Sequence, residues 1–415
     1  MVGDDGGGAL LINPAAMARR DTTRTELGGA AVEDTAEWQR ATDGVPLSVA
    51  RAGSRVAPFG AAIVALGDWI VGVGAMTAAV VARSLPHPNG VAGDTADKLG
   101  QAYDYRYTGI AGSFRRDMVA LGAAHRLGDS LALGASLGAS RIAATEERRI
   151  WSSHAGREVK TDQSDVDLAM SGTDPLVASA VLGVLYAPGD APIEIGASLG
   201  WTRTVQLDGS VTAAGIALGP EATTSAPHAS LRLNQPLAVR AGGRYVGDRL
   251  VAELDGDLWI APSGSAAAAW QLRGVHVGDG ADPAGPGAEL ERLPSRISQH
   301  THFALRSAID FAVVPGFLWI TGGYAFATGA TPDDQLSPSL GDLGGHTLGL
   351  GLEATAASVT VTLGWSRTWS PGIGARSRLL VDSPFVGGNG PVPRGTYYGS
   401  NDQAGVLVEV ELGGR

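Results

Sequence analysis

The chain of 415 residues contains no cysteine. This absence excludes a disulfide framework, a zinc site with thiolate ligands and catalysis by a thiol. Charged residues make up only 18% of the chain, and the formal net charge is -11. Because proteins that bind nucleic acids are typically basic, the negative charge argues against a nucleic-acid partner.

The start of the chain lacks the charged segment and apolar core of a secretory signal peptide. Leu10-Leu11-Ile12 is too short to be such a core. We therefore expect either a mature or truncated form of an exported protein or a protein that is not exported. A long apolar stretch, 56–82, contains the turn signal Gly67-Asp68, so we interpret it as two strands and a hairpin rather than a transmembrane helix.

Segments of alternating polarity follow one another along most of the chain. In 302–313, apolar side chains such as Phe303 and Leu305 occupy odd positions, and polar ones such as Arg306 occupy even positions. The same alternation occurs in 193–202, 249–260 and 358–366. Successive side chains of a strand point to opposite faces, so each strand has one apolar face. Runs of about 10 residues are long enough to cross a bilayer as tilted strands, although a large soluble β-protein also alternates.

Connections of two lengths separate these strands. The short ones lie at 67–68, 128–129, 189–192, 247–248, 315–316 and 356–357, and the long ones near 84–104, 152–175, 263–299, 330–342 and 370–400. Bacterial membrane barrels place short turns at one end and long external loops at the other. The sequence thus predicts an all-β fold, a transmembrane antiparallel β-barrel of about 14 strands.

Two Gly-x-Ser-x-Gly matches, 134–138 and 196–200, have the spacing of the nucleophile elbow of serine hydrolases. That elbow needs a turn from strand to helix, whereas both matches lie inside strand patterns, so we expect no catalytic residue. The acidic segment 161–167 is either a Ca²⁺ site or a solvated loop. The histidines are dispersed, and we expect no metal centre and no cofactor.

Charged residues also occur on the polar faces of the predicted strands. An arginine on the lipid face would cost roughly 2–4 kcal/mol at mid-bilayer, so these residues are expected to line the lumen. There the two signs would either pair across strands and hold a plug, or one of the arginines would meet a substrate carboxylate. The residues concerned are Arg240, Arg244, Glu253, Asp255, Asp257, Arg306, Asp310, Glu353, Glu409 and Glu411.

A set of short motifs runs through the chain in order. Asp4-Asp5 precedes Asn13-Pro14-Ala15-Ala16-Met17-Ala18 near the start, and Pro58-Phe59-Gly60 precedes the run 69–74. Further motifs lie at 181–188, 233–236, 322–326 and 342–351. As an ordered set they resemble the FadL/TodX family of outer-membrane transporters for hydrophobic compounds.

The resemblance implies a monomeric barrel, 22–415, in the outer membrane of a Gram-negative bacterium, with residues 1–21 as a shortened hatch inside it. Hydrophobic molecules, either long-chain fatty acids or aromatic hydrocarbons, would be captured at the outer loops. They would then leave sideways into the surrounding lipid and lipopolysaccharide. Such a protein is a passive transporter and not an enzyme. An open general porin for polar solutes is the alternative.

The resemblance also implies where the path runs. It places the hatch residues Asn13, Pro14, Ala15 and Met17 at the sideways exit. The exit itself is expected near the third strand, represented by Trp69, Gly72, Gly74 and Met76. The two glycines would either permit a distortion of that strand or only allow close packing against the hatch.

Overall fold

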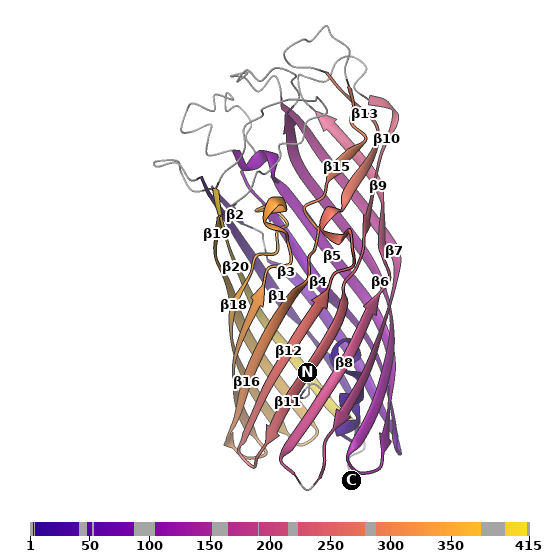
Figure 1. Ribbon diagram of the computed structural model, residues 1–415. Coiled ribbons are helices and arrows are strands. Elements are labelled where there is room, and N and C mark those ends of the chain that lie inside the picture. The colour runs from indigo at the N-terminus through magenta and orange to yellow at the C-terminus, as the bar shows by residue number, and fades with distance from the viewer. Residues whose placement is uncertain are drawn as a thin grey trace.

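The alternating segments form a tall barrel of tilted antiparallel strands, with a short helical segment inside its lower end (Figure 1). This computed structural model describes residues 3, 5–40, 48–51, 54–86, 104–151, 165–189, 191–214, 223–278, 288–374 and 395–412. None of the described helices has the length and apolarity needed to span a membrane.

Fourteen strands form the closed wall, as the sequence predicted. In order around the barrel they are β1 (Thr23–Arg40), β3 (Arg55–Leu66), β4 (Trp69–Ser84), β5 (Ala111–Leu127), β6 (Leu131–Trp151), β7 (Asp165–Tyr186), β8 (Ile193–Thr202), β11 (Leu237–Val246), β12 (Leu250–Ile260), β16 (His302–Val314), β17 (Leu318–Thr328), β18 (Gly344–Ala356), β19 (Val359–Gly374) and β20 (Gly395–Leu412). Each strand pairs antiparallel with the next, and β20 pairs with β1 from Thr23↔Leu412 to Arg40↔Gly395, which closes the barrel.

A smaller outer sheet extends this wall on one side. The half of β7 nearer the long loops leaves β8 and pairs instead with β9 (Val205–Ala214), over Asp167–Thr173. From there the sheet continues through β10 (Thr223–Leu233), β13 (Ala269–Val277), β14 (Ala288–Glu289) and β15 (Arg292–Pro294), and the short β2 (Ser48–Arg51) pairs with β1. Three short 3-10 helices lie among these elements: η2 (Asp104–Tyr107), η4 (Ser265–Ala267) and η5 (Asp333–Gln335).

Strands of the outer sheet occupy parts of two segments that were predicted to be loops. The prediction of a loop over 152–175 is wrong from Asp165 onward, and the prediction over 263–299 is wrong at β13 to β15. Alternating apolar residues in these stretches, among them Leu168 and Trp270, bury their side chains in a separate hydrophobic core. The prediction of a loop over 370–400 is wrong at both ends, because β19 runs to Gly374 and β20 begins at Gly395. Residues 87–103, 152–164 and 375–394 lie outside the described residues.

The short turns lie together at one end of the barrel, hereafter the turn end, which is the lower end in Figure 1. Gly67, Gly128 and Gly316 sit in these turns with φ of 65°, 69° and 73°. A side chain would strain the backbone in this left-handed region, so glycine suits the tight reversal between adjacent strands.

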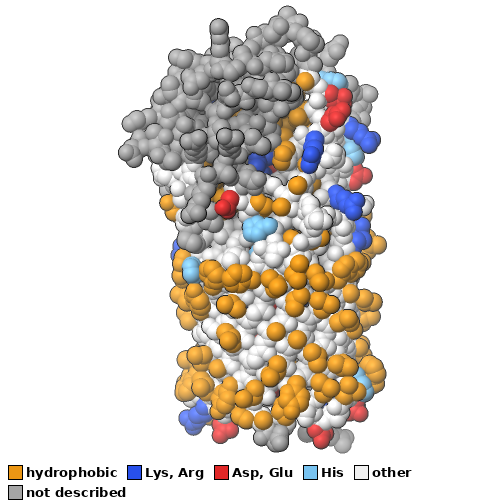
Figure 2. Space-filling model, viewed as in Figure 1, with side chains coloured by type: hydrophobic (Ala, Val, Ile, Leu, Met, Phe, Trp, Pro, Cys, Tyr) orange, Lys and Arg blue, Asp and Glu red, His pale blue; other side chains and the backbone are white. Residues whose placement is uncertain are grey.

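The wall turns its apolar faces outward. Leu137, Leu305 and Leu350 expose 70%, 52% and 62% of their surface, and side chains like them form a band around the lower half of the barrel (Figure 2). A soluble barrel would bury this face, because apolar surface in water costs about 25 cal/mol per Å². An outward apolar band with a polar interior is typical of a barrel that crosses a bilayer, which disfavours the soluble alternative.

Candidate functional site

Residues 5–22, hereafter the N-terminal segment, fold into two short helices inside the barrel near the turn end (Figure 1). They are α1 (Ala9–Ile12) and the 3-10 helix η1 (Pro14–Arg19). Asn13 caps the second helix, because its Oδ1 accepts a hydrogen bond from the Ala15 amide at 3.3 Å, and Pro14 takes the first helical position. The segment therefore has its own local structure and buries Leu10, Ala15 and Met17 almost completely.

Two serines of the wall hold the backbone of this segment. Ser136 Oγ donates a hydrogen bond to the Leu10 carbonyl oxygen at 2.6 Å, and Ser198 Oγ donates one to the Ile12 carbonyl oxygen at 2.5 Å. Asn13 Nδ2 donates to the Val184 carbonyl oxygen at 3.2 Å. The two serines are those of the Gly-x-Ser-x-Gly matches, so they anchor the segment. This role was not predicted from the sequence, although the occurrence of the same motif in both β6 and β8 could have indicated it.

Glycines of the wall form the sockets into which the segment fits. A Cβ at Gly134 would overlap the backbone of Pro14 and Ala15, and a Cβ at Gly183 would overlap the Asn13 side chain. Asn13, Pro14 and Ala15 thus lie against β6 and β7. Leu10 and Met17 are the side chains that reach β4, where a Cβ at Gly72 would lie 2.8 Å from Met17 Sδ and one at Gly74 would lie 3.2 Å from Leu10.

We expect the double variant Ser136→Ala, Ser198→Ala to loosen the segment. Each lost hydrogen bond should cost about 1 kcal/mol, since the Leu10 and Ile12 carbonyls would lose their partners inside the protein. Hydrogen exchange of amides in residues 9–19, followed by mass spectrometry, should then become faster. Ser366→Ala, on the opposite wall, is the matched control. Unchanged exchange in the double variant would show that these hydrogen bonds do not hold the segment.

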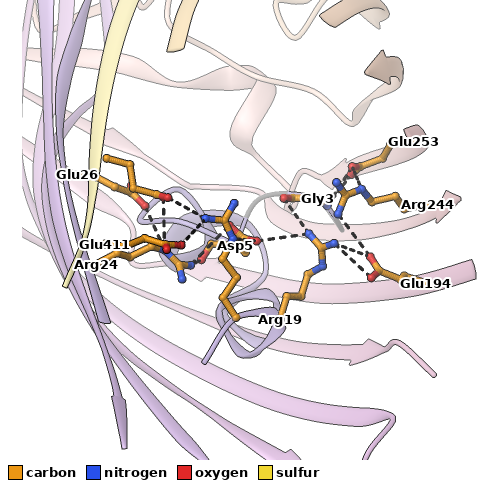
Figure 3. Close-up of polar contacts among 11 residues, drawn as sticks. Gly3, Asp5, Arg19, Arg24, Glu26, Glu194, Arg244, Glu253 and Glu411 are labelled. Carbon is orange, nitrogen blue, oxygen red and sulfur yellow. Dashed lines mark hydrogen bonds and ion pairs between the residues drawn. The ribbon is translucent and has the colours of Figure 1, made fainter. Parts of the chain in front are cut away.

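Arg20 of the segment and Arg24 of β1 form an ionic network on one side of the segment (Figure 3). Arg20 Nε lies 3.0 Å from Asp5 Oδ2, and Arg20 Nη1 lies 2.8 Å from Glu409 Oε1. Arg24 is fully buried and lies 3.6 Å from Glu409 Oε2 and 3.7 Å from Glu26 Oε1. Burial lowers the pKa of Arg20, but the carboxylates of Asp5, Glu409 and Glu411 outweigh burial and raise the pKa above its ordinary value.

Arg19 carries the network to the other side of the lumen. Its Nη2 lies 3.1 Å from Glu194 Oε2, and Arg244 lies 3.6 Å from the same carboxylate and 3.9 Å from Glu253 (Figure 3). The Gly3 amide donates to Glu253 at 3.0 Å. Because the network joins the segment to β1, β8, β11, β12 and β20, the segment is tied across the full width of the barrel.

The other charged residues expected in the lumen form separate groups. Asp257 pairs with both Arg306 and Arg240, the latter at 3.7 Å. Asp310 accepts a hydrogen bond from Thr321 at 2.7 Å. Asp255 is 6% exposed, and Glu353 lines a cavity described below. Of the residues predicted to line the lumen, those that lie at the segment are Arg244, Glu253, Glu409 and Glu411. The sequence did not predict the ion pairs made by Asp5, Arg19, Arg24, Glu26 and Glu194.

The wall is broken between β3 and β4. Pairing of these strands ends at Phe59↔Met76, although β3 continues to pair with β1 as far as Arg55. Beyond Met76, β4 shifts its register against β5 between Thr77 and Ala79. Residues 55–58 and 77–80 therefore leave an unpaired gap, hereafter the wall break, and the strand distortion lies here rather than at Gly72 or Gly74. Trp69 lies at the turn end of β4 and stacks on His125, so it is remote from the break.

Cavities lie on both sides of the wall break. The inner cavity, of about 680 Å³, and an apolar groove of about 680 Å³ on the outer surface share four lining residues, Pro58, Phe59, Met76 and Thr77. The groove also contacts Leu27, which is 73% exposed on the apolar band. The shared lining places the break between the lumen and the apolar outer surface.

Ala78 lines three cavities inside the barrel. It lines the inner cavity and two further cavities of about 430 and 320 Å³, which lie toward the long loops. Leu11 of the N-terminal segment lines the inner cavity and the smaller of these two. A solute that enters from the loop end would therefore reach Ala78 and Leu11 before the wall break.

No group of three or more potential metal ligands occurs among the described residues. Of the acidic segment 161–167, residues 161–164 lie outside the described part of the chain, and Asp167 pairs with Arg149.

Comparisons with solved structures match the whole barrel. A FadL homologue from Pseudomonas aeruginosa superimposes with a TM-score of 0.74 at 14% identity, with 98% of this chain and 96% of that chain covered. The chain has the fold of the FadL-type channels. The toluene transporters TbuX from Ralstonia pickettii and TodX from Pseudomonas putida have TM-scores of 0.65 and 0.66, each at 14% identity. They cover 98% of this chain and 94% and 93% of their own.

Sequence comparison adds no further relative: no protein-family model matches the chain, and no curated protein matches it.

Proposed function

We propose that the protein is a passive channel of a Gram-negative outer membrane that admits hydrophobic compounds, and that it is not an enzyme. The wall break carries this proposal, because the same four residues line the inner cavity and the apolar groove outside. Solved barrels with the same fold include toluene transporters and a monoaromatic hydrocarbon channel, which supports the choice of hydrophobic compounds.

The energetics favour a sideways exit. An apolar solute gains about 25 cal/mol for each Å² of surface that leaves water, so passage from the lumen directly into lipid avoids a second transfer through water. Capture at the long loops, passage by Ala78 and Leu11, and exit through the wall break form one path. Long-chain fatty acids and aromatic hydrocarbons both fit this scheme.

We propose that residues 1–21 act as a hatch within the barrel 22–415. The serine anchors and the glycine sockets hold the N-terminal segment against β4–β8, and the ionic network ties it to β1, β8, β11, β12 and β20. Leu10, Leu11 and Met17 form its side toward β4, and Asn13, Pro14 and Ala15 fix it to β6 and β7. One chain suffices for the path because the wall closes on itself through β1 and β20, and membrane lipid and lipopolysaccharide would surround it.

The proposal is tested with the purified protein in liposomes. We expect entry of a labelled long-chain fatty acid or a monoaromatic hydrocarbon above that of protein-free liposomes, and no entry of a small sugar. Entry of sugar without any gain for the hydrophobic probes would contradict the proposal and support the open general porin instead.

A further inference from the structure

The two helices of the N-terminal segment pack against one side of the lumen, whereas the side chain of Arg20 reaches across to β20. The helices contact the strands from β4 to β8. Across the lumen, Gly351, Gly364 and Gly405 are paired with one another on β18, β19 and β20. A Cβ at Gly364 would meet no atom within 4 Å. The described side chains therefore leave the β18–β20 side of the barrel open.

The inner cavity follows this open side toward the turn end. Besides the residues of the wall break, it is lined by Gly364, Thr362 and Thr360 of β19 and by Glu353 of β18. Where the cavity approaches the turn end, the side chains of Arg20 and Glu411 are 42% and 35% exposed. The cavity thus has a second direction, away from the wall break and along the N-terminal segment.

The charge of the lining separates the two directions. The charged lining residues are four carboxylates, Asp5, Glu26, Glu353 and Glu409, and one guanidinium, Arg20, which sum to -3. Arg24 and Arg19, which pair with these carboxylates, and Glu411, which pairs with Arg20, change the sum to -2. The apolar residues Phe59 and Met76 lie at the wall break instead. An apolar solute that entered the acidic part would strip water from carboxylates, which is costly.

We propose that the inner cavity has two exits, and that its acidic part is a water-filled passage for small hydrated cations beside the N-terminal segment. A cleft of one charge between low-dielectric walls concentrates counter-ions and repels ions of its own sign. Cations therefore follow β18–β20 to the turn end, and apolar solutes leave through the wall break. The cation passage stands on the cavity alone, whereas the division of traffic rests on the proposed function.

The absence of cysteine makes the passage accessible to single-cysteine labelling. Thr362→Cys faces the cavity, and Gly322→Cys is the matched control because it shares the outward face of Ile320 and Tyr324. We expect a cationic methanethiosulfonate reagent to modify Thr362→Cys at least about tenfold faster than an anionic reagent of similar size, the lower end of known electrostatic focusing. Gly322→Cys, on the lipid face, should react with neither of these charged reagents. Equal rates at Thr362→Cys, or no reaction there, would overturn the proposal.

Conductance provides a second readout that does not depend on transport of hydrophobic compounds. In a planar bilayer under a KCl gradient, the reversal potential should indicate cation selectivity, and Glu353→Lys should reduce it. Glu353 makes no ion pair or side-chain hydrogen bond with the described residues, so this change breaks none, although a lysine there would also repel Arg20 and attract Asp5 and Glu409. Gly364→Trp should lower the conductance, and Gly322→Trp, on the lipid face, should leave it unchanged.

The outcomes separate the two proposals. Cation conductance without uptake of hydrophobic compounds would retain the passage and reject the proposed function. Uptake by a folded protein that shows no cation conductance would reject the passage. Gly364→Trp is expected to keep uptake while losing conductance, and loss of both together would contradict the separation of the exits.

Discussion

Replacing Ala78 by tryptophan should reduce uptake of hydrophobic compounds by about tenfold or more. Ala78 lines all three described cavities of the lumen, next to the wall break, so an indole there would stand in the path of every solute that approaches the gap. A solute squeezing past the indole would meet steric overlap of about 1–3 kcal/mol, and an added barrier of about 1.4 kcal/mol corresponds to a factor of ten. Liposome uptake of a labelled fatty acid and of toluene would measure the loss.

The control for this variant is Ala404→Trp. Ala404 lies on the outward face of β20 beside Val406, where an indole would enter the apolar band rather than the lumen. Uptake should therefore remain at the level of the unmodified protein. Equal uptake by both tryptophan variants would show that hydrophobic compounds do not pass Ala78.

Replacing Gly134 by leucine should open the barrel to sugars. A Cβ at this position would overlap the backbone of Pro14 and Ala15, and backbone overlap cannot be relieved by a change of rotamer. The N-terminal segment would therefore have to leave its socket, while the strands of the wall keep their pairing. Liposome swelling in a small sugar should change from absent to rapid.

Gly256→Leu is the matched control for this second variant. A Cβ at Gly256 would lie 3.5 Å from Leu305 Cδ2, an ordinary contact on the outward face. It should leave swelling unchanged. If Gly134→Leu also remained closed to sugar, with the segment shown by hydrogen exchange to be displaced, the segment would not be the barrier.

Much of the wall could be predicted because its pattern is local. Phe303, Leu305 and Ile309 alternate with polar residues over one strand, and a period of two requires no knowledge of neighbours. Gly67 and Gly128 likewise mark turns by their own conformational freedom. Strand number, face and turn positions follow from such short-range features.

Contacts between distant parts of the chain could not be predicted in this way. Arg20 meets Glu409, and Arg19 meets Glu194, across most of the sequence. Ser136 and Ser198 had the spacing of a catalytic motif and are anchors, because the carbonyls that they bind belong to residues 10 and 12. The local sequence around one residue of such a pair does not indicate which distant residue it will contact.

The amino-acid order alone specified an antiparallel barrel with an apolar exterior, because the direction of each side chain in a strand depends only on parity. The position of the proposed exit could be found only from the folded chain. The wall break arises from where β3 stops pairing with β4 and where β4 shifts against β5. Register describes how two strands align with each other, so it cannot be predicted from the sequence of either strand alone.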